Sequence, residues 1–276
     1  MSQRPPFPAR LDFSTGSASG KNGAGKSVAG KKTVTTAVGQ GVIGQKPRQP
    51  ALPAMSSGHG MDSAAVRARM VRNLAASGIG SAAVLQALGT VERHRFVDTA
   101  LVNQAYEDTS LPIGLGQTIS KPNVVARMCE LLLGAELARA GPLARVLEIG
   151  TGCGYQAAVL SLLTREVYSI ERLRGLHDKA RDNLRPFRLP NVHLLFGDGM
   201  LGYAKGAPYA GIIAAAGGEA VPQAWIDQLA TGGRIIAPTQ MPGGGQALVV
   251  LQKTTHELKQ TVLEAVHFVP LKSGIA

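Results

Sequence analysis

The chain has 276 residues, of which 45% are hydrophobic, and carries a formal net charge of +11 at pH 7. This apolar content is enough for a folded core, and no run of residues reaches the length that a membrane span needs. The two cysteines and six histidines stand at no metal-ligand or disulfide-framework spacing, so we expect no metal and a reducing compartment, the cytoplasm.

Residues 1–60 differ from the rest of the sequence. They contain eight basic residues and one acid, Asp12, so they carry +7 of the total charge and leave +4 for residues 61–276. Rich in Gly, Ser and Lys, this tail is predicted to be disordered and solvated, with no specific nucleic-acid partner. The segment Gly20–Ser27 matches a P-loop, but no strand precedes it and no helical pattern follows, so we interpret it as a chance match. The tail has no apolar signal-peptide segment.

Residues 61–122 are expected to form a helical cap and a substrate loop. Apolar residues recur at helical spacing, first from Val66 to Leu74 and then from Val84 to Leu88, with Ser81 placed to cap the second helix. The following stretch, Tyr106–Ser120, contains Pro112, Gly114 and Gly116, which forbid a long regular element. It leads into another helical pattern and is predicted to lie over a crevice.

Residues 123–276 are expected to form an α/β core around one central stretch. Arg145–Ile149 is a short apolar run that stops at Gly150, Gly152 and Gly154 and resumes as a helical pattern, so it predicts strand, tight turn and helix. Glycines there let a ligand approach main-chain N–H groups at a helix N-terminus.

The spacing of this turn separates two kinds of cofactor. A dinucleotide fingerprint requires a third glycine where this chain has Tyr155, so a pyrophosphate ligand is disfavoured. Glu148, at the strand end, is expected to meet the ammonium group of S-adenosylmethionine. Glu171 lies about 20 residues past the turn, at the spacing for binding ribose hydroxyls, and Asp198 ends a third apolar run, where it can hold the adenine amino group.

Further strands are predicted near residues 166–170, 192–196, 210–215 and 233–237, with helical segments between them. This alternation indicates a doubly wound, mostly parallel, Rossmann-like sheet. Two strand-like runs, 247–253 and 258–269, are joined by a polar turn and predict a C-terminal antiparallel hairpin.

The loop that follows the fourth strand bears on the substrate. Residues 214–219 lack the Asn or Asp, Pro-Pro and aromatic arrangement that would hold an amino group for methylation. A carboxylate acceptor is already ionised at neutral pH and needs no general base. Catalysis is then largely alignment, for which Thr118–Ser120 supply hydroxyl and main-chain donors.

Several motifs together resemble the protein-L-isoaspartate (D-aspartate) O-methyltransferase family. In chain order they are Leu111–Pro122, Val146–Tyr155, Gly197–Gly199, Pro222–Leu229 with Gly232–Arg234, and Phe268–Leu271. The resemblance implies methyl transfer from S-adenosylmethionine to the α-carboxyl of L-isoaspartyl residues in damaged proteins, after which the ester cyclises to a succinimide that reopens partly to aspartate. It also implies a methyltransferase fold over residues 61–276.

The resemblance assigns roles to individual residues. Ser120 takes the family's active-site serine position, while Gln117, Thr118 and Ile119 line the junction of cofactor and substrate. The nucleoside is held by Glu171, Asp198 and Gly199.

Each of these residues also has a purely structural interpretation. Ser120 is well placed to cap the following helix, Glu171 to begin a helix, Asp198 to form a turn, and Glu148 to cap loop N–H groups.

Two departures from the family leave other functions open. The acid usual before the fourth strand is replaced by Ala210, and Gly217–Gly218 stand where relatives carry proline, which is expected to loosen a segment beside the substrate. The alternatives are methylation of a small-molecule carboxylate or hydroxyl, and a catalytically weak protein that binds S-adenosylmethionine.

Overall fold

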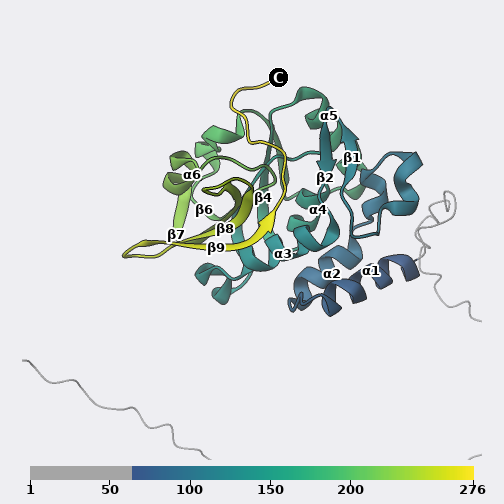
Figure 1. The fold of residues 1–276 in the computed structure, drawn as a ribbon, viewed down its shortest axis with the longest axis horizontal. Coiled ribbons are helices and arrows are strands. Elements are labelled where there is room, and N and C mark those ends of the chain that lie inside the picture. Colours follow the sequence, from purple (N-terminus) through teal and green to yellow (C-terminus); the bar gives the residue numbers. More distant parts are fainter. Residues whose placement is uncertain (1–63) are drawn as a thin grey trace, which may run out of the picture. The chain divides into compact units, whose positions relative to one another are not determined.

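The computed structural model describes residues 64–276, so the predicted disordered tail lies outside the described residues. The two predicted cap helices are present as α1 (Ala64–Ala76) and α2 (Ala82–Thr90), and they lie side by side in Figure 1. Ser81 caps α2 as expected, because its Oγ accepts a hydrogen bond from the Val84 backbone N–H at 3.4 Å. Two short 3-10 helices follow, at Arg93–Phe96 and Thr99–Gln104.

The predicted irregular loop contains a small antiparallel hairpin. Strands β1 (Leu111–Gly114) and β2 (Gln117–Ile119) pair with each other and with no other strand of the described chain. The turn between them holds Gly114 and Gly116 at φ of 97° and 68°, a left-handed region that glycine adopts without steric cost. These glycines correctly predict that no long regular element forms here, but the short β1–β2 hairpin was not predicted.

A seven-stranded sheet forms the centre of the fold, in the order β5-β4-β3-β6-β7-β8-β9. The first five of these are parallel neighbours, and β8 and β9 complete the sheet as antiparallel strands. The predicted doubly wound sheet with a C-terminal antiparallel hairpin is therefore confirmed (Figure 1). The strands are β3 (Leu143–Ile149), β4 (Thr164–Glu171), β5 (Val192–Phe196), β6 (Tyr209–Ala214), β7 (Leu229–Gln240), β8 (Gln246–Lys253) and β9 (Leu258–Val266).

Helices cover both faces of this sheet, and the alternation along β3 shows the two layers. Val146 belongs to one buried apolar cluster, which also holds residues of the helices α1 to α5, whereas Leu147 belongs to a second, which holds Trp225 of α6. The remaining α-helices are α3 (Pro122–Leu133), α4 (Tyr155–Ser161), α5 (Arg174–Leu184) and α6 (Gln223–Gln228). Short 3-10 helices lie at Glu136–Ala140, Arg185–Phe187, Gly199–Leu201 and Ala204–Gly206.

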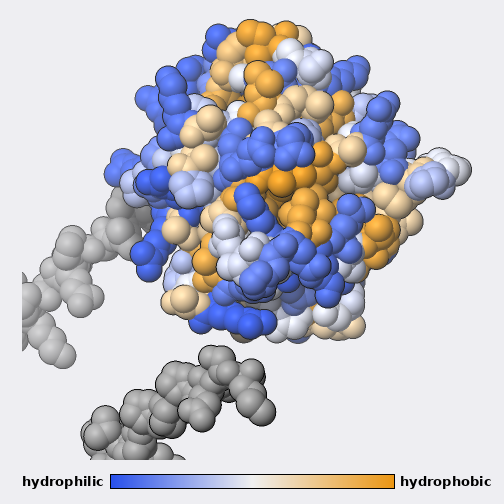
Figure 2. Space-filling view, turned by 90° about the vertical axis from the view of Figure 1, so that its left-hand side faces the viewer, coloured by the Kyte–Doolittle hydropathy of each residue, from blue (hydrophilic) through white to orange (hydrophobic). Residues whose placement is uncertain are grey.

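The side of the molecule on which α6 lies in Figure 1 faces the viewer in Figure 2. Apolar side chains gather there in a hollow band between polar ones. None of the helices that the structure describes is both long and apolar enough to span a bilayer.

The segment after β9 runs back over the carboxyl ends of the strands. Leu271 donates its backbone N–H to the Gly217 carbonyl at 2.7 Å, and Gly217 donates to Val269 at 2.8 Å. Gly218 donates to Pro238 and accepts from Gln240. The expectation that these two glycines loosen the segment is therefore wrong, because both are fixed by main-chain hydrogen bonds on two sides.

Candidate active site

A pocket of about 470 Å³ lies at the carboxyl ends of β3, β4 and β6. In the sheet order β3 lies between β4 and β6, so the chain reverses direction across the sheet at this point. Such a switch point is where open α/β sheets bind ligands. The walls come from Ile149 and Ile170 of the strands, from β2, and from the returning segment Val269–Lys272.

The glycine turn forms the floor of the pocket. Gly150 and Gly152 line it with φ of 88° and 57°, and a side chain at either position would be strained. The Gly150 and Thr151 backbone N–H groups both donate to the Ile170 carbonyl, at 2.9 and 3.2 Å, which fastens the turn to the neighbouring strand. Gly154, also predicted to bind the cofactor, does not line the pocket; it caps α4 and packs against Leu184.

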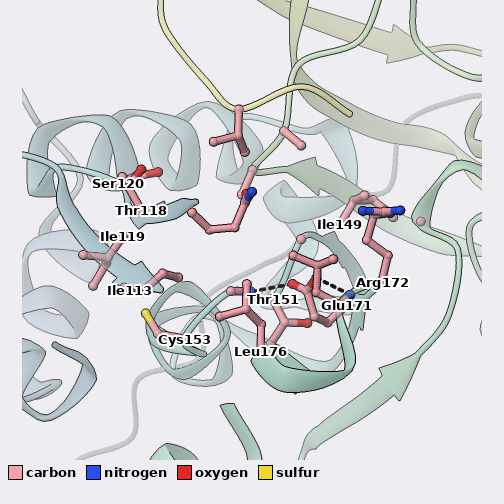
Figure 3. A pocket seen from close by; sticks show the side chains of 18 of the residues that line it. Ile113, Thr118, Ile119, Ser120, Ile149, Thr151, Cys153, Glu171, Arg172 and Leu176 are labelled. Atoms are coloured by element: carbon pink, nitrogen blue, oxygen red, sulfur yellow. Dashed lines mark hydrogen bonds between the residues drawn. The ribbon is translucent and has the colours of Figure 1, made fainter. Parts of the chain in front are cut away.

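Glu171 lies at the end of β4, and its carboxylate faces the pocket (Figure 3). One oxygen accepts the Gly152 N–H at 2.9 Å and the other accepts the Leu173 N–H at 2.9 Å. An ionised carboxylate has about four lone-pair sites, so two remain for a ligand. The side chain is thus held with free acceptor sites at the pocket, where the predicted contact with ribose hydroxyls would lie.

The structure places Glu148 below the turn instead of in the pocket. Successive strand residues point to opposite faces, so its side chain is directed into the α3–α4 layer and is fully buried. Ser169 donates its hydroxyl to Glu148 at 2.5 Å, and Ser169 also bonds Thr151 of the turn at 2.6 Å. Burial raises the pKa of Glu148 to about 8, although the Ser169 hydrogen bond opposes the shift.

Asp198 lies beside the pocket without lining it. Its two carboxylate oxygens accept the backbone N–H groups of Met200, at 2.8 Å, and of Gly274, at 2.6 Å. The neighbouring Gly199 does line the pocket, and a Cβ there would come within 2.6 Å of the Ile149 side chain. The Trp225 indole N–H donates to the Gly199 carbonyl at 2.8 Å and holds this backbone in place.

Strand β2 and the residue after it form the opposite wall of the pocket. All four of these residues line it: Gln117, Thr118, Ile119 and Ser120. Figure 3 shows Thr118 to Ser120 on the opposite side of the cavity from Glu171. The interpretation of Ser120 as the cap of α3 is wrong. The N-cap position is Lys121, and Asp108 accepts the Asn123 N–H at 2.8 Å, so the Ser120 hydroxyl is not used by the helix end.

The chemistry of the lining favours an ionised substrate. Cys153 lines the pocket, but burial raises the pKa of its thiol to about 11, so it stays protonated and is a poor nucleophile. Among the described residues that line the cavity there is no histidine, and two cations, Arg172 and Lys272, stand at its rim. A pocket lined in this way suits a methyl acceptor that is already negatively charged and needs no general base.

The lining also fits S-adenosylmethionine. Apolar side chains (Ile149, Ile170 and Leu176) provide surface for adenine and for the carbon chain of the methionyl arm, while the side-chain-free turn leaves room beside main-chain atoms. Glu171 supplies a buried acceptor for a diol.

Some lining residues were missed by sequence reasoning. Leu271 belongs to the Phe268–Leu271 motif but was not assigned to the site; its long-range main-chain hydrogen bond to Gly217 brings it and the following Lys272 to the pocket, and no local pattern predicts that contact. Arg172 directly follows Glu171, and its adjacency to a predicted site residue was the available clue.

Comparison with known proteins identifies relatives over most of the chain. Residues 65–276 match the family model of protein-L-isoaspartate(D-aspartate) O-methyltransferase. A protein-L-isoaspartate O-methyltransferase of Methylibium petroleiphilum is 54% identical over 98% of this chain and 96% of its own length. Another, of Leptothrix cholodnii, is 56% identical over 82% of this chain and 80% of its own length.

Solved structures agree with the sequence relatives. A protein-L-isoaspartate O-methyltransferase structure superposes with a TM-score of 0.68 at 28% identity and covers 76% of this chain and 67% of that one. A Plasmodium falciparum protein, solved in complex with S-adenosyl-L-homocysteine, has a TM-score of 0.63 at 21% identity over 75% of this chain and 98% of its own, and shares the fold. From the family match and the high identity to its relatives, the chain belongs to the protein-L-isoaspartate(D-aspartate) O-methyltransferase family.

Proposed function

We propose that this chain transfers the methyl group of S-adenosylmethionine to the α-carboxyl of L-isoaspartyl residues in damaged proteins and peptides. The observation that carries the proposal is the placement of Thr118–Ser120 across one pocket from the glycine turn and Glu171. Names of relatives at more than 50% identity support the same reaction.

The cofactor, when bound, supplies an electrophilic methyl group on a positively charged sulfur. The residues of this chain then have three tasks. Gly150, Gly152 and Gly199 leave room for the donor, and Glu171 accepts hydrogen bonds from its ribose. Ser120 and the main chain of β2 orient the substrate carboxylate in line with the methyl group. Alignment of two reactants in this way contributes about 7 to 11 kcal/mol in favourable systems.

The roles that we propose for the other two predicted acids, Asp198 and Glu148, are based on their contacts. Asp198 positions the Gly199 backbone and the segment around Gly274 next to the adenine side. Glu148 supports the floor of the pocket through Ser169 and Thr151. Both are proposed to act on the cofactor through the residues that they hold.

A methyl-transfer assay on paired peptides tests the function. The isoaspartyl peptide is expected to accept methyl groups and its normal aspartyl twin none, because only the isoaspartyl link, which runs through the side chain, leaves the α-carboxyl free; in the aspartyl twin that carboxyl is part of the peptide bond. Ser120→Ala should lower kcat at least tenfold and leave the affinity for S-adenosyl-L-homocysteine within twofold. The matched control is Thr255→Ala, which removes a hydroxyl from the exposed β8–β9 turn.

Two other results would each replace the proposal. Equal labelling of both peptides would show that the isoaspartyl link is not recognised, and the acceptor would then be a different carboxylate or hydroxyl. Cofactor binding by calorimetry without turnover on any isoaspartyl peptide would make the chain a binding protein.

A cytoplasmic location is part of the same proposal. Cys129 and Cys153 are both free and buried, as expected in a reducing compartment. Cell fractionation with an antibody to the chain checks this, and recovery with the membrane or secreted fraction would contradict it.

A further inference from the structure

A second cavity, a surface groove of about 530 Å³, adjoins the pocket. One wall is the first turns of α3, with Lys121, Asn123, Val124 and Arg127, and the other is the end of β9 with the residues that follow it, Glu264 to Phe268. Nothing in the proposed function uses this groove.

The groove and the pocket meet at one residue. Ser120 lines both cavities, and its neighbour Lys121 lines only the groove. When the carboxyl group held at Ser120 belongs to a polypeptide, that polypeptide must extend away from Ser120 in at least one direction. The groove is the cavity into which such a chain extends from Ser120.

The groove is shaped by a β-bulge. Ala247 pairs with Ala265 and Val249 with Val262, so Leu248 stands opposite two residues of β9, Leu263 and Glu264. A bulge of this kind redirects a side chain, and here both Leu248 and Glu264 line the groove. Glu264 bonds Arg127 of the facing helix at 3.0 Å and ties the two walls together.

The charges in the groove leave one cation without an acidic partner. Arg127 contacts two carboxylates, those of Glu264 at 3.0 Å and Glu130 at 3.5 Å. Lys121 forms no ion pair with any residue that the structure describes, and it is partly exposed next to Ser120. The end of the groove nearest Ser120 therefore presents a positive charge.

The strand beside the groove can also pair with an extended chain. β9 is the last strand of the sheet order, so its outer edge has no partner strand in the described part of the chain. Edge strands of this kind bind extended peptides through main-chain hydrogen bonds, while pockets select side chains.

We propose that this groove binds the extended polypeptide that flanks the isoaspartyl residue, and that Lys121 selects substrates with an acidic side chain on that flank. The inference rests on the proposed function and adds the substrate sequence that the enzyme prefers. Lys121 is a specificity residue here, since the reacting carboxyl group contacts Ser120 and not Lys121.

Kinetics on matched peptides test the inference. Each isoaspartyl peptide carries Glu or Lys at one of the four positions nearest the isoaspartyl residue, two on either side. The native full-length enzyme is expected to give a KM about threefold lower for Glu than for Lys on one side only, with equal kcat. The attraction between Lys121 and an acidic substrate side chain is exposed to solvent, so added salt weakens it. The ratio of the KM for the Lys peptide to the KM for the Glu peptide should therefore approach one at 1 M salt.

Variants assign the preference to one residue. Lys121→Gln should make the two peptides equivalent and Lys121→Glu should invert the preference, while the KM for S-adenosylmethionine stays within twofold. The matched control Lys205→Gln removes a cation from an exposed site elsewhere and should keep the native ratio. Thermal unfolding of each variant confirms that α3 still folds, and direct peptide binding by fluorescence anisotropy gives a second measure of the ratio.

The outcomes separate the two proposals. An unchanged flank preference in Lys121→Glu, or no flank preference in the native enzyme, would overturn this inference and leave isoaspartyl methylation intact. Absence of methyl transfer to every isoaspartyl peptide would overturn both.

Discussion

At the residue scale, two acids near the glycine turn do different things because of the strand position that each occupies. Glu171 ends β4 and points into the pocket, whereas Glu148 lies one residue before the end of β3 and points into the core. A carboxyl group buried there is more stable protonated than ionised, which is why the pKa of Glu148 rises to about 8. We propose that it supports the pocket floor indirectly, through its hydrogen bond with Ser169.

The raised pKa of Glu148 predicts how stability depends on pH. The folded state keeps the proton up to about pH 8, while the unfolded chain loses it near the ordinary pKa of a glutamate, 4.5. Between these pH values unfolding releases a proton, so the free energy of unfolding falls as pH rises, by up to about 1.4 kcal/mol per pH unit. Glu148→Gln should remove that slope.

Urea titrations of both proteins from pH 4.5 to 9 measure the difference. Glu219→Gln, at an exposed position, shows what the loss of one carboxylate does by itself. Parallel curves for the native chain and Glu148→Gln would mean that Glu148 is ionised in the folded protein.

At the element scale, the strands and helices were predictable wherever one residue pattern continued over a whole element. The strands before the glycine turn and after it, and the two cap helices, follow their apolar periodicity. The β1–β2 hairpin was missed because three-residue and four-residue strands are too short to show a period. Helix α3 was predicted, but its cap was not, because Asp108 reaches Asn123 from fifteen residues away in the sequence.

The segment Lys272–Ala276 forms a clasp over the loops that follow β4 and β5. Gly274 donates to Asp198 at 2.6 Å and accepts from the Arg172 Nε at 2.9 Å. Ala276 donates to the Arg172 carbonyl at 2.8 Å and accepts the Arg174 N–H at 2.8 Å. We expect this clasp to complete the wall of the pocket on the adenine side.

Removal of the Asp198 carboxylate should release the clasp. A hydrogen bond to a charged acceptor contributes about 1.5 to 3 kcal/mol, so Asp198→Ala is expected to speed hydrogen exchange of the amides in the clasp about tenfold or more. The dissociation constant of S-adenosyl-L-homocysteine, measured by calorimetry, should rise in the same variant. Asp227→Asn in α6 is the control, and unchanged exchange in Asp198→Ala would show that the hydrogen bonds to Arg172 and Arg174 hold the clasp without Asp198.

At the scale of the whole molecule, the site is assembled from three parts of the sequence that are far apart. The turn and the strand ends carry glycine and acid signals that sequence reasoning detects. Ser120 was identified by its motif, and the Phe268–Leu271 motif lies in the segment that returns to the pocket. The sequence could not predict which way each of these residues faces. Whether Glu148, Gly154 and Asp198 face the pocket or lie behind its lining depends on strand register and long-range contacts.

The last prediction concerns how much of the chain the enzyme needs. The family match begins at residue 65, and the pocket and the groove are both lined by residues from Ser110 onward. The sequence of residues 1–60 carries +7 of the total charge of +11 and a smaller share of apolar side chains than the whole chain. We therefore propose that residues 61–276 are a complete methyltransferase domain, and that a chain beginning at Met61 keeps the unfolding temperature and the kcat of the full-length protein.

Ligand binding gives this prediction a sharper readout than activity. S-adenosyl-L-homocysteine at about 100 times its dissociation constant stabilises a binding-competent fold by about 2.7 kcal/mol, which for a domain of this size raises the unfolding temperature by about 5 to 10 °C. Both chains should show the same increase, while cation-exchange retention should fall in the shorter one because seven positive charges are lost. A smaller increase in the shorter chain would place part of the binding site, or part of its support, in the first sixty residues.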